Sequence, residues 1–182
     1  MRKIIVTEFL SLDGVMENPA WTFPYWNDEI AAFKDEEKNA SDALLLGRIT
    51  YEGFASSWPK MSPEKEPFAP YMNNVRKYVV SSTLKEPLAW NNAVLIKGNF
   101  VEEVNKLKQQ DGRDIAVHGS AALAQTLMQH DLVDCLRLLV YPVVVGKGQR
   151  LFKEGSAATW KLVASQAFSS GVVSLVYEPA RK

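Results

Sequence analysis

Short apolar runs alternate with amphipathic stretches up to Asp131, and this order predicts an α/β fold. Residues 3–9, 43–46, 77–81, 93–96 and 115–117 have the length and apolar composition of β-strands. Apolar residues recur at helical spacing in the intervening residues 27–39, 50–55, 101–109 and 121–129. Because buried strands joined by helices pair in parallel, we expect a mixed, mostly parallel central sheet flanked by helices.

The pattern changes after Asp131, where long β-type runs occupy residues 133–145 and 160–177. The turn Ser169-Ser170-Gly171 divides the second run, which predicts a C-terminal antiparallel hairpin. Residues 58–70 are rich in proline and charge and predict a loop that could close over a site. No linker-like segment divides the chain, so we expect residues 1–182 to form a single domain.

Composition and charge exclude several classes of protein function. The chain has 182 residues, 47% hydrophobic and 23% charged, as in ordinary soluble globular proteins. Lys plus Arg equals Asp plus Glu at 21 each, so no overall basic field favours nucleic acid or an anionic membrane. The single cysteine, Cys135, excludes an intramolecular disulfide, and no metal-ligand cluster is visible. The N-terminal apolar run breaks at Thr7-Glu8, too early for a signal peptide, so we expect a cytoplasmic protein.

Two glycine turns carry the strongest functional signal. In the first, an apolar run ends at Gly47 and Arg48, and Thr50 follows in the first turn of a helix; in the second, a strand runs into Gly119 and Ser120 ahead of another helix. A helix N-terminus has unpaired N–H groups and a partial positive charge, so each turn can hold a phosphate. Two such turns could clasp one diphosphate, which points to a dinucleotide cofactor. The alternative is a pair of structural turns with a surface arginine.

Five segments, in this order along the chain, resemble those of the dihydrofolate-reductase-like family, and within it the branch related to the C-terminal reductase domain of the bacterial riboflavin-biosynthesis deaminase-reductase. They are Ser11-Leu12-Asp13-Gly14, Leu46-Gly47-Arg48-Ile49-Thr50-Tyr51-Glu52, Val79-Val80-Ser81-Ser82-Thr83, Val117-His118-Gly119-Ser120-Ala121, and Pro142-Val143-Val144-Val145-Gly146-Lys147-Gly148 with Leu151-Phe152. The resemblance covers nearly the whole chain. It implies a three-layer fold, an NADPH-dependent reductase and a homodimer.

The resemblance also implies where the cofactor lies, namely across the carboxyl ends of the strands. The implied contacts are Gly47, Arg48, Thr50, Ser81, Ser82, Gly119, Ser120, Ala121 and Ala122. Ser81 and Ser82 would meet the adenosine 2′-phosphate, although these hydroxyls can equally cap the following loop. Dihydrofolate reductases proper have paired glycines where this chain reads His118-Gly119-Ser120.

The sequence leaves more than one choice for the residues that would act on the substrate. By the resemblance, Glu29 corresponds to the acid of dihydrofolate reductases that helps to protonate the pterin, whereas the riboflavin branch uses the region of Asp13 for a ribose-phosphate substrate. We therefore keep both acids as candidates for proton delivery. Trp21 and Trp26 fall in an aromatic loop where flat rings could stack on a heterocycle, or could form a hydrophobic plug or a dimer contact.

These observations lead to one hypothesis and one rival. The hypothesis is an NADPH-dependent reductase that transfers hydride to a small nitrogen heterocycle, either dihydrofolate-like or a ribosylated aminopyrimidine, with no metal, nucleic acid or membrane partner. The rival is a catalytically weak or inactive dinucleotide-binding homodimeric scaffold, which keeps the fold without the reaction.

Overall fold

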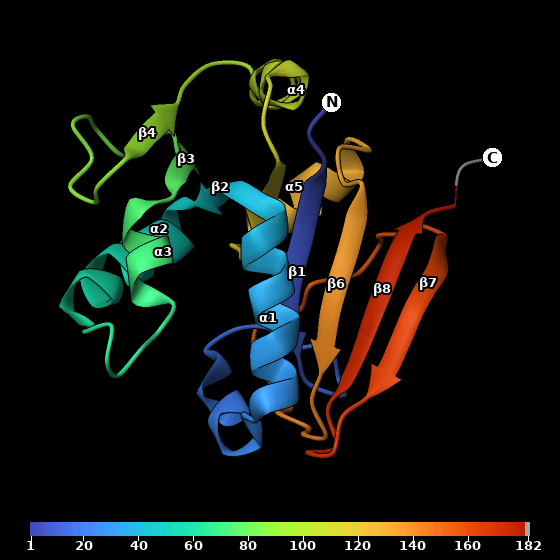
Figure 1. Cartoon of the computed structure of the whole chain (residues 1–182). Coiled ribbons are helices and arrows are strands. Elements are labelled where there is room, and N and C mark those ends of the chain that lie inside the picture. Colours follow the sequence, from blue (N-terminus) through green and yellow to red (C-terminus); the bar gives the residue numbers. More distant parts are fainter. Residues whose placement is uncertain (181–182) are drawn as a thin grey trace.

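Eight strands form one sheet in the order β4-β3-β2-β5-β1-β6-β8-β7 in the computed structural model, which describes residues 1–180 (Figure 1). The strands are β1 (Ile4–Leu10), β2 (Ser41–Gly47), β3 (Arg76–Val80), β4 (Ala93–Ile96), β5 (Asp114–Val117), β6 (Cys135–Val140), β7 (Trp160–Ala167) and β8 (Val173–Pro179). All pairs from β4 to β6 are parallel, whereas β8 pairs antiparallel with both β6 and β7. The predicted mixed sheet with a C-terminal hairpin is therefore confirmed.

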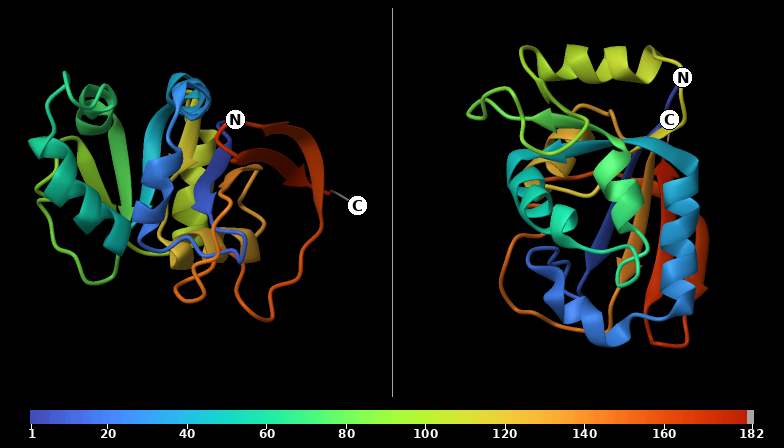
Figure 2. Two further views of the ribbon diagram at one scale, coloured as in Figure 1. Left: turned by 90° about the horizontal axis from the view of Figure 1, so that it is seen from below. Right: turned by 60° about the vertical axis from the view of Figure 1, so that its left-hand side comes forward.

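Helices cover both faces of this sheet, which gives three layers (Figure 2). They are α1 (Asp28–Ala40), α2 (Arg48–Ser57), α3 (Ala69–Asn74), α4 (Phe100–Gln109) and α5 (Ala121–Gln129), with the 3-10 helices η1 (Pro19–Tyr25) and η2 (Trp58–Lys60). Most buried apolar residues of α4 and α5 belong to one core cluster, and most of those of α1, α2 and α3 belong to two others. Among residues 1–180, no helix has the length and hydropathy needed to cross a membrane.

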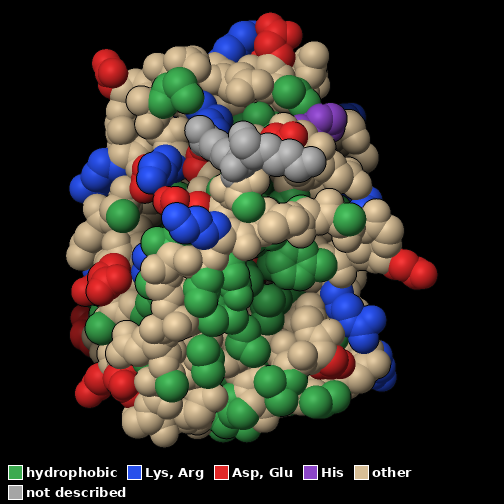
Figure 3. All heavy atoms as spheres, turned by 90° about the vertical axis from the view of Figure 1, so that its right-hand side faces the viewer, with side chains coloured by type: hydrophobic (Ala, Val, Ile, Leu, Met, Phe, Trp, Pro, Cys, Tyr) green, Lys and Arg blue, Asp and Glu red, His purple; other side chains and the backbone are tan. Residues whose placement is uncertain are grey.

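The antiparallel end of the sheet leaves one face open. Leu162 of β7 pairs with Tyr177 of β8, so both side chains lie on the same face of the hairpin. Tyr177 and Leu175 are only partly buried against the core, and Leu162 is 48% exposed. Hydrophobic side chains gather on this side of the molecule (Figure 3). The reason is local, because no helix follows β6 within the described residues, so none covers the hairpin from that part of the chain.

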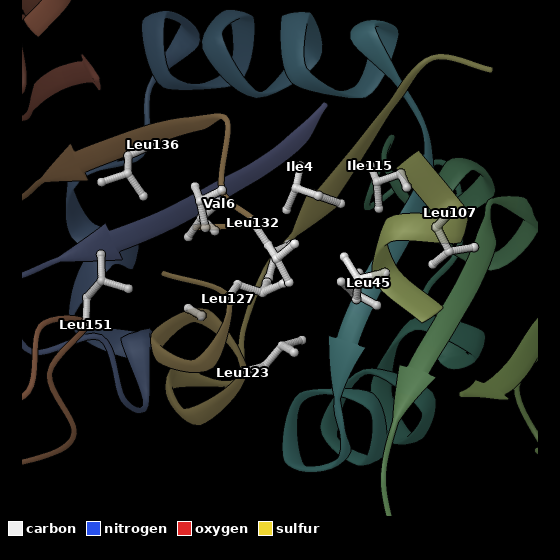
Figure 4. Close-up of a cluster of buried hydrophobic side chains, with 14 of the residues drawn as sticks. Ile4, Val6, Leu45, Leu107, Ile115, Leu123, Leu127, Leu132, Leu136 and Leu151 are labelled. Carbon is white, nitrogen blue, oxygen red and sulfur yellow. The ribbon is translucent and has the colours of Figure 1, made fainter. Parts of the chain in front are cut away.

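The central strands are apolar on both sides because both sides are buried. Leu45 of β2 packs in the cluster of α4 and α5, while Leu44 and Leu46 pack in the cluster of α2 and α3. In β1, Val6 and Leu10 belong to the first of these clusters, in which Figure 4 labels Val6. Successive side chains of a strand point to opposite faces, so this pattern fixes which face every β1 residue occupies.

Two predicted elements differ from the structure. Residues 58–70 were expected to form a loop, but they contain η2 and the start of α3, a helix that the composition did not indicate. The predicted strand at residues 133–145 ends at Val140, and the chain then bends away. The carboxylate of Asp13 accepts hydrogen bonds from the Val145 and Gly146 amides at 3.1 and 2.8 Å, and these bonds hold that segment as a loop.

Candidate functional site

The two glycine turns lie in contact at the carboxyl edge of the sheet. They follow the neighbouring parallel strands β2 and β5, whose carboxyl ends therefore meet at one edge. The Gly47 amide donates a hydrogen bond to the Gly119 carbonyl at 3.1 Å. The convergence expected from the sequence is present, and open α/β sheets bind ligands at this kind of edge.

Close packing explains why both turns contain glycine. A Cβ atom on Gly47 would lie 3.0 Å from the backbone nitrogen of Ser120, and a Cβ atom on Gly119 would lie 2.7 Å from the Thr50 hydroxyl. Gly119 also has a φ of +112°, which side-chain-bearing residues rarely adopt. The peptide bond between Gly119 and Ser120 is cis. At each glycine the missing side chain thus leaves room for a residue of the other turn, Ser120 beside Gly47 and Thr50 beside Gly119.

Two helix N-termini open at this contact. Helix α2 begins at Arg48 directly after Gly47, and no side chain caps its N-terminus. Helix α5 begins one residue after Ser120, whose hydroxyl accepts a hydrogen bond from the Leu123 amide at 3.4 Å. The positive ends of both helix dipoles therefore lie at the contact between the turns. The first-turn N–H groups lie there too, including those of Ala121 and Ala122. This arrangement favours an anion with several oxygens.

The other predicted cofactor residues lie near this edge with different surroundings. Arg48 is half-exposed and pairs with Glu52 at 2.9 Å within α2. Ser81 follows β3, the strand next to β2, so it comes to the same edge. Its hydroxyl accepts hydrogen bonds from the Thr83 and Leu84 amides at 3.1 and 3.0 Å, which is the loop-capping role that the sequence left open. Ser82 is exposed beside it.

The two acids proposed for proton delivery both hold loops in place. Glu29 accepts hydrogen bonds from the Ser169 amide at 2.8 Å and from Asn27 at 3.1 Å, and bonds to Ser169 lower its pKa. Asp13 accepts from the Ser11 hydroxyl at 2.6 Å and from two loop amides, which lowers its pKa to about 2. These bonds favour the ionised forms, whereas a proton donor at neutral pH needs a raised pKa. The catalytic roles of both acids stay predictions.

The aromatic loop forms η1 and packs partly into the core. The Trp21 ring meets Tyr141 edge-on with centroids 5.6 Å apart, and Tyr25 and Phe9 contact the same tyrosine. Trp26 is 47% exposed. Trp21 also lines a hollow of about 370 Å³ beside the loop that carries Lys147. The hydrophobic-plug interpretation thus fits Trp21, while the ring of Trp26 stays open to solvent.

Sequence reasoning missed Glu8, a buried acid on β1. It is only 8% exposed, and its Oε1 atom has no hydrogen-bond partner. Burial raises the pKa of Glu8 to about 8. His118, which follows β5, is partly buried, and loss of water lowers its pKa to about 3, with Lys34 adding repulsion. The signal in the sequence was a charged residue within an otherwise apolar strand.

The fold and the paired turns define an α/β protein of dihydrofolate-reductase-like architecture. Residues 2–174 match the RibD C-terminal domain family, and the chain belongs to it. The chain is 36% identical over 181 residues to "Uncharacterized protein YyaP" of Bacillus subtilis (strain 168), with 97% of this chain and 94% of that protein covered.

Two solved structures are similar in fold. A putative riboflavin biosynthesis protein from Shewanella sp. PV-4 has a TM-score of 0.75 at 20% identity, covering 98% of this chain and 99% of that one. Dihydrofolate reductase from Enterococcus faecalis complexed with NADP(H) has a TM-score of 0.64 at 15% identity, covering 98% and 97%. The resemblance stated from the sequence is therefore confirmed.

The contact between the turns predicts opposite effects for two glycine substitutions. Gly47→Ala places a methyl group against the Ser120 backbone and should reduce the free energy of unfolding by about 1–3 kcal/mol. Gly53→Ala, in α2, meets nothing within 4 Å and should raise it by up to about 1 kcal/mol, because alanine favours helix. Urea unfolding measures both, and an unchanged midpoint for Gly47→Ala would contradict the close packing.

The buried acid predicts a pH dependence of stability. The pKa of Glu8 is about 8 in the native state and 4.5 in the unfolded chain. Between these two pH values the native state therefore holds a proton that the unfolded chain has lost. Stability from this group therefore falls as pH rises from 4.5 to 8, by on the order of 1 kcal/mol per pH unit. Glu8→Gln should remove this slope, and the exposed Glu154→Gln should keep it. Parallel slopes in urea unfolding for wild type and Glu8→Gln would contradict the assignment.

Proposed function

We propose that this protein is an NADPH-dependent reductase, and the contact between the two glycine turns carries the proposal. A diphosphate needs several N–H donors and positive potential in one place, and α2 and α5 both begin there. Arg48 and the hydroxyls of Thr50 and Ser120 add side chains suited to phosphate oxygens. When bound, NADPH would supply the hydride.

The order of the strands gives the cofactor a direction. Ser81 and Ser82 follow β3, on one side of the turns, so they would receive the adenosine 2′-phosphate. The nicotinamide end would then extend to the other side, toward β1. The E. faecalis dihydrofolate reductase, which is similar in fold, is complexed with NADP(H), and this supports the choice of cofactor.

The substrate we propose is a small nitrogen heterocycle, either dihydrofolate-like or a ribosylated aminopyrimidine. The chain's own contribution would be to hold this acceptor against the nicotinamide ring and to exclude water. One observation favours the rival scaffold function: Glu29 and Asp13 are both engaged in hydrogen bonds that favour their ionised forms. A turnover assay separates the two, because a scaffold would bind cofactor without consuming it.

Fluorescence titration tests the cofactor site. Wild type should bind NADPH saturably, and Thr50→Val should raise the dissociation constant about 10-fold through loss of a hydrogen bond to a charged phosphate. Thr126→Val is the matched control, since its hydroxyl bonds to a carbonyl within α5. NADPH oxidation is then followed with dihydrofolate and with the ribosylaminopyrimidine. Lack of saturable NADPH binding by wild type would refute the proposal.

We further propose that two copies of the chain associate through the open face of the β7–β8 hairpin. Leu162 is exposed there and Leu175 and Tyr177 are only partly buried, so the three side chains present an apolar surface. Large exposed apolar patches rimmed by polar groups commonly mark protein interfaces. A second copy is the occupant we favour, because the same self-complementary patch on both subunits gives a closed two-fold pair.

A charge placed on that face should separate the subunits. We expect wild type to elute at the mass of a dimer in size-exclusion chromatography with light scattering, and Leu162→Asp to shift it toward the 20.4 kDa chain mass. Gln166→Asp is the control, because Gln166 pairs with Ser174 and projects from the opposite face of β7. A monomeric wild type, or a dimer indifferent to Leu162→Asp, would refute this interface.

A further inference from the structure

The side chain of Glu8 occupies a position where the fold gives it no partner. On β1, Val6 and Leu10 pack in the core cluster of α4 and α5, so Glu8, which lies between them on the same face, points toward that layer. Its Oε1 atom is buried and makes no hydrogen bond. A buried polar atom without a partner is costly and calls for an explanation.

The polar residue next to Glu8 on β1 is Thr7, and its hydroxyl has hydrogen-bond partners. Thr7, on the opposite face, donates a hydrogen bond to Glu37 at 2.8 Å and accepts one from Lys34 at 2.9 Å. Arg137 of β6 donates to the same Glu37 at 3.0 Å. The fold thus satisfies the polar groups on the α1 side of β1, whereas Glu8, on the other face of the same strand, keeps a buried oxygen without a hydrogen bond.

The position of Glu8 along β1 places it beside the second glycine turn. The pairing of β1 with β5 ends at Val6 and Val117, and the chain of β5 then leaves through His118 to Gly119. Glu8 comes two residues after the last pair, where β1 has lost its β5 neighbour but is still paired with β6 through Leu138. It therefore lies on the β1 side of the turns, the side toward which the nicotinamide end of the proposed cofactor would extend.

We propose that Glu8, as a neutral carboxylic acid, recognises the carboxamide group of the nicotinamide ring, its O–H donating to the amide carbonyl and its second oxygen accepting from the amide N–H. A carboxylic acid and a primary amide each offer one donor and one acceptor side by side, so the pair forms two hydrogen bonds. This inference rests on the proposed function. It assigns Glu8 the role of fixing the orientation of the ring, separate from the phosphate grip of the turns.

Burial, rather than the surrounding charges, keeps Glu8 neutral near pH 7. Burial is the largest cause of its raised pKa of about 8, Glu37 raises the pKa further, and Lys34 opposes them. His118 at the end of β5 is neutral because its pKa is about 3. No residue of α5 (Ala121–Gln129) is charged, and Leu138 is the neighbour on β6. Glu8 therefore still holds a proton to donate at neutral pH.

Two ligands separate the role of Glu8 from that of the turns. NADPH has the carboxamide, whereas 2′-phospho-ADP-ribose has the same phosphates and no nicotinamide. We expect Glu8→Leu to raise the dissociation constant of NADPH at least about 10-fold, the equivalent of one to two net hydrogen bonds, and that of 2′-phospho-ADP-ribose less than about 2-fold. Glu8→Gln, whose amide can also pair with a carboxamide, should weaken NADPH binding less than Glu8→Leu does.

The pH profile gives a second measurement that needs no apolar variant. For wild type, NADPH binding should weaken above about pH 8 as Glu8 ionises, while 2′-phospho-ADP-ribose binding should not show this change. Glu8→Gln should lose that dependence. Equal effects of Glu8→Leu on both ligands, or a wild-type NADPH profile flat through pH 8, would overturn the role of Glu8 and leave the cofactor site intact. Failure of wild type to bind either ligand would instead refute the proposed function, and this inference with it.

Discussion

The contact between Gly47 and Gly119 is the constraint on which the candidate site depends. Each turn approaches so closely that a single Cβ atom would collide with the other, at the Ser120 nitrogen or at the Thr50 hydroxyl. Because the two strands before these turns are neighbours in a parallel sheet, the contact brings two helix N-termini together without any dedicated binding domain. The site is therefore a product of sheet topology, with side chains added around it.

Features that depend on local sequence were predictable. The apolar strands before Gly47 and Gly119 are recognisable because burial on both faces removes any need for polar alternation. The hairpin was predictable from its Ser-Ser-Gly turn. The resemblance to the RibD C-terminal domain branch, carried by five short segments, located the same edge of the sheet.

Features that depend on distant partners were not predictable. Residues 133–145 form a continuous apolar pattern, and only the Asp13 carboxylate, far away in the chain, shows why the strand ends at Val140. Helix α3 was not predicted, because the residues before it are rich in proline and charge. Glu8 was visible as a break in an apolar run, but its unpaired oxygen is a property of the packed structure alone.

The hydrogen bonds of Asp13 also tie two distant segments into one mechanical unit. Its carboxylate holds the amides of Val145 and Gly146, and the nearby Glu17 carboxylate holds the Gln149 amide at 2.9 Å. The hydrogen bonds that Asp13 accepts also lower its pKa to about 2, so this carboxylate stays ionised near neutral pH. A displacement of the segment after β1 would therefore be transmitted through these hydrogen bonds to the segment after β6.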